Sequence, residues 1–300
     1  MYPPRITLNP TIRKATLMDR SYTMPRLCFT TTAVLALLGV ALRTVCLLCF
    51  YDADPGYFVE GFLPSLSNVL YFIAVAVGII GALLVPKNTL PSELHIPQRA
   101  PLAVLLGIAL AVFTIISLFF CFPARRSDIM LAPTLLGLLA STYYFLSASR
   151  NGRYPDWLSF LGYLPVFWSI GSVAETYFDP YTTMNSPVKL ALQMGFLGFM
   201  LVALAELRFR VGRSLPRYSL ALLALGSYTC LVGSIPILIA TGARVLESLQ
   251  HLLYAVVLLC AGLYSLYLLF SYTCRPATVT DEAPQEDQPP SPASANPNAE

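Results

Sequence analysis

The feature that most constrains this chain is an apolar run of membrane-spanning length, which recurs along the whole sequence. A helix of about 20 apolar residues crosses the hydrocarbon core of a bilayer. Eight such runs predict helices at about 26–50, 64–85, 101–122, 129–148, 156–178, 187–209, 218–240 and 247–272. The chain is only 12% charged, whereas an average soluble domain is about 25% charged. The sequence therefore predicts an all-α integral membrane protein with a bundle of eight transmembrane helices.

The eight runs form one transmembrane domain over residues 26–272, with a polar segment at each end. Residues 1–25 are basic and contain no apolar core. The first apolar run lacks the small-residue cleavage signature of a signal peptide, so we expect it to be retained as a helix. Residues 273–300 are rich in Pro, Ala and Glu without an apolar period. We expect this tail to be disordered, because it cannot bury enough surface to fold.

The Lys and Arg residues are divided unequally between the two sides of the predicted bundle. Fourteen of the 19 lie on the side that holds both termini, four lie on the other side, and Arg43 lies within a span. Short cytoplasmic loops carry an excess of Lys and Arg in membrane proteins. This bias predicts that both termini are cytoplasmic and that the protein is a multi-pass protein of the plasma membrane, with the lipid bilayer as its surroundings.

Several classes of site leave no trace in the sequence. There is no Walker loop, no H-E-x-x-H, no G-x-S-x-G and no G-x-G-x-x-G. Two His residues are too few for a His-rich metal site, and no basic stripe with interleaved aromatics indicates nucleic acid. The seven Cys residues lie in or beside apolar runs, where they suit packing better than disulfides. We therefore expect no cofactor, no metal and no nucleic-acid partner, and we assign no catalytic residue.

Polar side chains within the predicted spans gather toward one face of the membrane, the outer face in the predicted orientation. Ionisable groups in hydrocarbon are costly, so each is a candidate for function. The candidate ligand-binding residues are Arg43, Asn68, Glu175, Lys189, Gln193, Glu247, Gln250, His251 and Tyr254. On the last span, four of them stand at i, i+3, i+4 and i+7, which places them on one face of the helix.

The charged candidates predict specific partners. Lys189 lies at a helix N-terminus, where the macrodipole disfavours a cation, so we expect Glu175 or Asp179 beside it. A lone Arg43 is also costly in hydrocarbon, and the sequence favours its pairing with Glu175 or Glu247. At the other end of the same span as Lys189, Glu206 and Arg210 stand at i and i+4 in the favourable order, which indicates a structural pair.

The leading interpretation is a protein that binds, transports or senses a small polar or charged solute. Its outward-facing polar pocket would be lined by the spans at 26–50, 64–85, 156–178, 187–209 and 247–272. One alternative is a membrane-embedded enzyme acting on a lipid or lipid-linked substrate, with Glu175 or His251 as acid or base. Another is a non-catalytic scaffold whose buried polar groups fix helix register. Transporters often interrupt their helices near the bilayer midplane, and here Pro165 and Pro236 predict kinks.

Overall fold

The computed structural model describes residues 10–52, 56–85, 101–121, 128–149, 156–179, 182–183, 185–211 and 215–274. Seven helices in this part of the chain are long and apolar enough to cross a membrane. They are Met24–Cys49, Phe62–Leu84, Pro101–Phe120, Leu131–Ser149, Pro187–Val211, Pro216–Gly242 and Leu249–Cys274. The predicted all-α membrane architecture is confirmed to this extent.

The described elements follow the predicted runs closely. In chain order they are α1 (Pro10–Cys49), β1 (Tyr51–Asp52), β2 (Tyr57–Phe58), α2 (Phe62–Leu84), α3 (Pro101–Ile116), the π-helical turn η2 (Ser117–Cys121), α5 (Asp128–Ser149), α6 (Asp156–Leu161), α7 (Leu164–Phe178), α8 (Pro187–Val211), α9 (Pro216–Gly242) and α10 (Leu249–Cys274). The predicted first residue of the helix at 187–209 is confirmed, since α8 begins at Pro187. Proline suits this position because its missing N–H would have no partner there.

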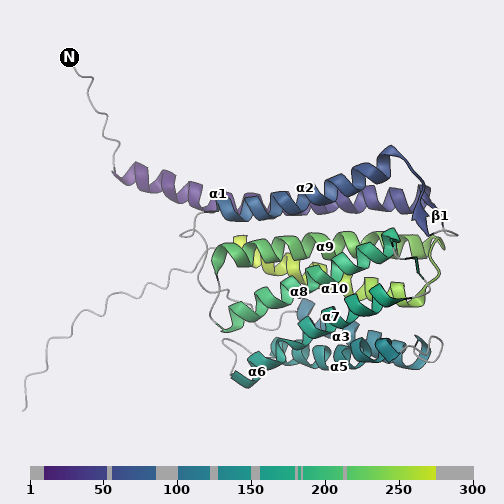
Figure 1. Ribbon diagram of the computed structural model, residues 1–300. Helices are drawn as coiled ribbons and strands as arrows, with labels where there is room; N and C mark the ends of the chain where they lie inside the picture. Colours follow the sequence, from purple (N-terminus) through teal and green to yellow (C-terminus); the bar gives the residue numbers. More distant parts are fainter. Residues whose placement is uncertain are drawn as a thin grey trace, which may run out of the picture.

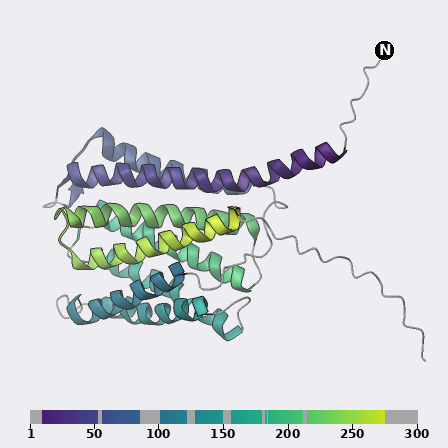
Figure 2. The same cartoon turned by 180° about the vertical axis from the view of Figure 1, so that it is seen from behind.

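The helices lie roughly side by side in layers (Figures 1 and 2). The α1–α2 pair forms one outer layer, and α3, α5 and α6 lie at the opposite side of the bundle. Between them, α9 contacts α1, α2, α8 and α10, while α7 contacts α5 and α8. α9 is therefore the central helix, and it separates the α1–α2 pair from α7.

An aromatic cluster fills the core between α3, α7, α8 and α10. The Trp168 ring lies 5.7 Å from Phe113, 5.6 Å from Phe196 and 6.3 Å from Tyr254 between ring centroids. The Tyr254 ring also packs 4.8 Å from Phe196. Edge-on aromatic pairs at such distances contribute about 0.5–1.5 kcal/mol each beyond the area they bury. The cluster fixes the relative positions of α7, which carries the buried carboxylate described below, and α10, which supplies its hydrogen-bond donors.

The predicted span at 156–178 is broken and does not merely bend at Pro165. α6 ends at Leu161, two residues form a turn, and α7 begins at Leu164. Within the turn, the Gly162 amide donates to the Ser159 carbonyl at 3.2 Å. The break precedes Pro165 because its ring clashes with the carbonyl four residues earlier and it has no N–H to donate. The 15 residues of α7 are too short to cross the roughly 30 Å hydrocarbon core as one helix.

The structure has more helix before α1's predicted start, and a short hairpin after its end, than the sequence predicted. The helix begins at Pro10, well before the expected start near residue 26, and continues through Pro25. Its N-terminal part extends beyond the end of the bundle (Figure 1). After α1, Tyr51 pairs with Phe58 in a short antiparallel hairpin. Gly56 in that hairpin has φ of 72°, a left-handed conformation that favours glycine.

Small residues recur every four positions on α2, at Ala74, Gly78 and Ala82, and form a ridge that faces its neighbours in the bundle. Ala74 and Ala82 are buried, and a Cβ atom added to Gly78 would lie 3.3 Å from the Leu225 side chain of α9. Small residues allow helices to approach closely in membranes. The ridge therefore brings α2 onto α9.

The basic loop at 86–100, the turn at 150–155 and the tail after residue 274 lie outside the described residues.

Candidate functional site

Arg43 lies near the C-terminal end of α1 and joins three segments of the chain. Its Nη1 donates to Asn68 Oδ1 of α2 at 3.2 Å, and its Nη2 donates to the main-chain carbonyl of Pro187 at 2.8 Å. Its guanidinium carbon lies 5.1 Å from the centre of the Phe58 ring, in a cation–π arrangement. Among the residues that the structure describes, Arg43 has no carboxylate partner.

A cavity of about 270 Å³ lies beside the Arg43 guanidinium, between α1, α2, α8 and α9. Its polar lining groups are Arg43, Asn68 and Tyr71. The other lining residues are apolar: Phe72, Leu190, Ala191, Met194, Val232 and Gly233. The buried Tyr71 hydroxyl has no hydrogen-bond partner in the described structure. The cavity thus offers a cation and an amide against an otherwise apolar wall.

The first turn of α8 separates this cavity from a second polar cluster. Pro187 faces α1 through its carbonyl, whereas the Lys189 ammonium donates to the main-chain carbonyl of Asp179, just after α7, at 3.3 Å. The Lys189 side chain is only 2% exposed. Lys189 thus lies beside Asp179, one of its two expected neighbours, but the contact is made by the Asp179 main chain and not by its carboxylate. The Asp179 carboxylate itself accepts from Thr182 at 2.7 Å.

Glu175 forms the centre of the second cluster, between α7 and α10. Its side chain is 6% exposed. Gln250 Nε2 donates to Oε1 of Glu175, and the Tyr254 hydroxyl donates to Oε2. Each carboxylate oxygen therefore has a donor from α10, which lowers the cost of burying it. The predicted shared face of α10 is confirmed for Gln250 and Tyr254, which are both buried.

The remaining sequence candidates lie at the margins of these two groups. Gln193 is half-buried on α8 and Glu247 is exposed before α10 begins. His251 is half-buried, and its amide donates to Ser248 Oγ at 3.4 Å. The single pocket predicted from the sequence is therefore divided. Arg43 and Asn68 lie at the cavity, whereas Glu175, Gln250 and Tyr254 form a separate cluster.

The predicted pairing of Arg43 with Glu175 or Glu247 is wrong. Arg43 is on a helix that packs against α2 and α9, while Glu175 is on a helix that packs against α5 and α8. The predicted Glu206–Arg210 pair is confirmed, with 3.3 Å between Arg210 Nη2 and Glu206 Oε1. Both side chains are buried, so this pair belongs to the interior of the bundle and not to its surface.

Sequence reasoning missed three groups of the site, of which only Tyr71 has a local signal in the sequence. Tyr71 stands three residues after Asn68 and shares its helix face, which is a detectable signal. The Pro187 carbonyl and the Phe58 ring approach Arg43 only through the tertiary fold. Outside the spans, burial raises the pKa of the Tyr51 phenol, whose ring packs 6.3 Å from Phe58. Tyr51 therefore remains neutral in the hairpin whose Phe58 ring contacts Arg43.

Within the described ranges, no group of three or more His, Cys, Asp or Glu residues could hold a metal ion. No protein-family model, curated protein or solved structure matches the chain. The function is therefore inferred from the geometry of the residues themselves.

Proposed function

We propose that this multi-pass membrane protein binds a small anionic solute with an apolar body and carries it or senses it. The solute enters from the outward-facing side, and its anionic group is bound by Arg43 and Asn68. An anionic solute with an apolar body is a narrower class than the small polar or charged solute expected from the sequence. The apolar body occupies the cavity between α1, α2, α8 and α9.

The observation that carries this proposal is that the charge of Arg43 has no described counter-charge. Its two hydrogen bonds go to a neutral amide and a neutral carbonyl, and no described carboxylate balances its charge. An unbalanced cation within a span is costly unless it has a function or a wet surrounding. A guanidinium has five N–H donors in a fixed fork, so donors remain for a carboxylate or phosphate. The apolar lining residues select for a ligand whose remaining atoms are apolar.

The buried Glu175 cluster supports a structural role for that residue and not acid or base catalysis. Both of its oxygens accept from α10, so it ties α7 to α10 beside the aromatic core. A general base needs an oxygen that can reach substrate. This arrangement favours Arg43 and its cavity for the proposed ligand-binding role, and it makes the enzyme interpretation the weaker alternative.

We also propose that the chain crosses the membrane eight times and that both termini lie in the cytoplasm. Together α6 and α7 extend from one end of the bundle to the other, and the end of α10 lies at the same end as the N-terminal part of α1 (Figures 1 and 2). An even number of crossings accounts for this arrangement, and the excess of Lys and Arg favours the cytoplasm for that side. Reporter fusions test it: a fusion at residue 183 should lie outside and a fusion at residue 151 inside, and the reverse result would contradict it.

The ligand class is tested by thermal unfolding of the full-length protein in detergent with three probes of equal chain length. Hexyl phosphate and hexanoate carry an anion, whereas hexanol carries none. A ligand that binds only the folded state raises the unfolding temperature. We expect both anions to stabilise the protein and hexanol to have no effect at the same concentration. Equal stabilisation by hexanol, or none by either anion, would refute the proposed anion site.

A further inference from the structure

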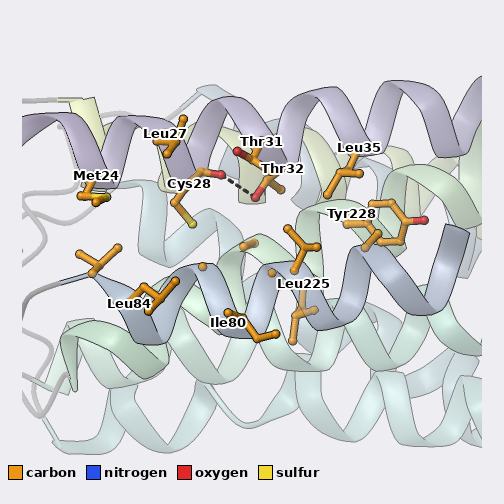
Figure 3. A pocket seen from close by; sticks show the side chains of 16 residues that line it. Met24, Leu27, Cys28, Thr31, Thr32, Leu35, Ile80, Leu84, Leu225 and Tyr228 are labelled. Carbon is orange, nitrogen blue, oxygen red and sulfur yellow. Dashed lines mark hydrogen bonds between the residues drawn. The ribbon is translucent and has the colours of Figure 1, made fainter.

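A second cavity, of about 240 Å³, lies between α1, α2 and α9, toward the end of the bundle that carries the N-terminal part of α1 (Figure 3). Its wall is almost entirely apolar. Met24, Leu27 and Leu35 line it from α1, Leu84 from α2 and Tyr228 from α9. The Thr32 hydroxyl on this wall donates to the Cys28 carbonyl of its own helix at 2.8 Å, so it adds little polarity. The other hydroxyls on this wall are those of Thr31 and Tyr228, and no charged or amide side chain lines it.

The cavity has the length and the opening of a site for one lipid chain. Met24 and Leu35 are 11 residues apart along the helix, which is about 16 Å at the usual rise per residue. One leaflet of hydrocarbon is about 15 Å thick, half of the roughly 30 Å core. The cavity is open to the side, because Leu27, Ile80 and Leu84 are lining residues and are also exposed. In a bilayer, that side faces acyl chains.

A cation lies where such a lipid would carry its headgroup. Arg217, in the first turn of α9, donates from Nε to the carbonyl of Val85 at 2.7 Å. Val85 closes α2 and lines the same cavity. This bond fixes the guanidinium, and within the described part of the chain its two Nη groups have no hydrogen-bond partner. They are suited to a phosphate at the membrane boundary.

We propose that this cavity binds one acyl chain of an anionic glycerophospholipid, whose phosphate is bound by Arg217. Gly81 of α2 keeps the space open. A Cβ atom at Gly81 would meet only the Cys28 sulfur, at 3.9 Å, so a larger side chain there would extend into the cavity without a clash at its base. This lipid site is separate from the Arg43 cavity, and neither proposal depends on the other.

The test uses full-length protein in phosphatidylethanolamine vesicles that contain a phospholipid with a photoreactive group on its acyl chain. Two probes with the same chains are compared, phosphatidylglycerol and the zwitterionic phosphatidylcholine. Adducts are mapped by mass spectrometry to residues of the cavity and, for reference, to the exposed Ile108 and Val112 of α3. We expect phosphatidylglycerol to label the cavity roughly fivefold more than phosphatidylcholine, the preference that one arginine near an anionic lipid supplies.

Two variants and their controls separate the two parts of the site. Gly81→Leu should remove labelling of the cavity by both probes, whereas Gly242→Leu, where an added Cβ meets nothing within 4 Å, should leave it unchanged. Arg217→Gln should keep the labelling but abolish the headgroup preference, and Arg208→Gln at an exposed site should preserve that preference. Equal labelling by both probes in the unmodified protein would overturn the proposal. Labelling of the cavity that is no denser than labelling of α3 would also overturn it.

Discussion

The Arg43 guanidinium donates to the main-chain carbonyl of Pro187 across 2.8 Å and thereby ties the C-terminal end of α1 to the first turn of α8. The same guanidinium holds Asn68 on α2. One side chain thus joins three helices that border the cavity. Because the donor is charged, the loss of these bonds should lower the free energy of unfolding as well as the affinity for a ligand.

Arg43 and Asn68 should be energetically coupled. Arg43→Ala is expected to lower the free energy of unfolding by about 1.5–3 kcal/mol, since hydrogen bonds from a charged group are lost. In a double-mutant cycle measured by unfolding in detergent, Arg43→Ala and Asn68→Ala should show a coupling of about 0.5–1.5 kcal/mol. The cycle of Arg43→Ala with Glu175→Ala should be additive. Coupling of Arg43 to Glu175 as large as its coupling to Asn68 would contradict the division into two clusters.

The Glu175 cluster should be more sensitive to loss of the acceptor than to loss of either donor. Glu175→Ala leaves the buried Gln250 amide and Tyr254 hydroxyl without their acceptor, at about 1–3 kcal/mol for each group. Tyr254→Phe removes one donor and leaves Gln250 in place, so its cost should be smaller. The free energies of unfolding of these variants are compared with that of Glu247→Ala, an exposed control. A Glu175→Ala variant as stable as the control would rule out the tie between α7 and α10.

The Glu206–Arg210 pair should behave as a buried ion pair and not as a surface one. Its atoms lie 3.3 Å apart with both side chains buried. Glu206→Ala leaves the Arg210 charge without this partner, which should cost about 3–5 kcal/mol. Replacing both residues by Leu should recover much of that loss, because the desolvation of two charges disappears together. A single substitution that costs less than about 1 kcal/mol would indicate that water reaches the pair.

Gly78 should be intolerant of a large side chain. A Cβ atom there would already lie 3.3 Å from Leu225, so Gly78→Leu should overpack the contact between α2 and α9. The expected cost is about 1–3 kcal/mol in the free energy of unfolding. The matched control is Gly242→Leu, where the added atom meets open space. Equal stability of the two variants would mean that α2 moves away from α9 without loss.

Hydropathy predicted most of the fold because each span is independently required to be apolar over its length. All seven long helices lie within the predicted runs apart from a few residues at their ends and the extension of α1 to Pro10. The break before Pro165 was harder to place. A proline indicates a disturbance, but whether the helix bends or stops depends on whether neighbours such as Gly162 can form a tight turn there.

The site was only partly predictable, because a helix face can be read from spacing but a neighbouring helix cannot. The stripe on α10 correctly grouped Gln250 with Tyr254. The predicted pairing of Arg43 with Glu175 failed because α9 and the first turn of α8 lie between their helices. Arg43 instead donates to the Asn68 side chain and to the Pro187 main-chain carbonyl. A main-chain carbonyl is a group that every residue carries and that no sequence pattern marks.

The most direct test of the central claim is equilibrium binding of radiolabelled hexyl phosphate to the purified full-length protein and to two variants. Charge-assisted hydrogen bonds contribute about 1.5–3 kcal/mol, so Arg43→Gln should weaken binding by roughly tenfold to a hundredfold. Arg208→Gln, at an exposed position toward the opposite end of α8, should bind like the unmodified protein. Saturable binding that depends on Arg43 and not on Arg208 is the predicted result. Identical affinity in Arg43→Gln, or binding displaced equally well by hexanol, would contradict an anion site at Arg43.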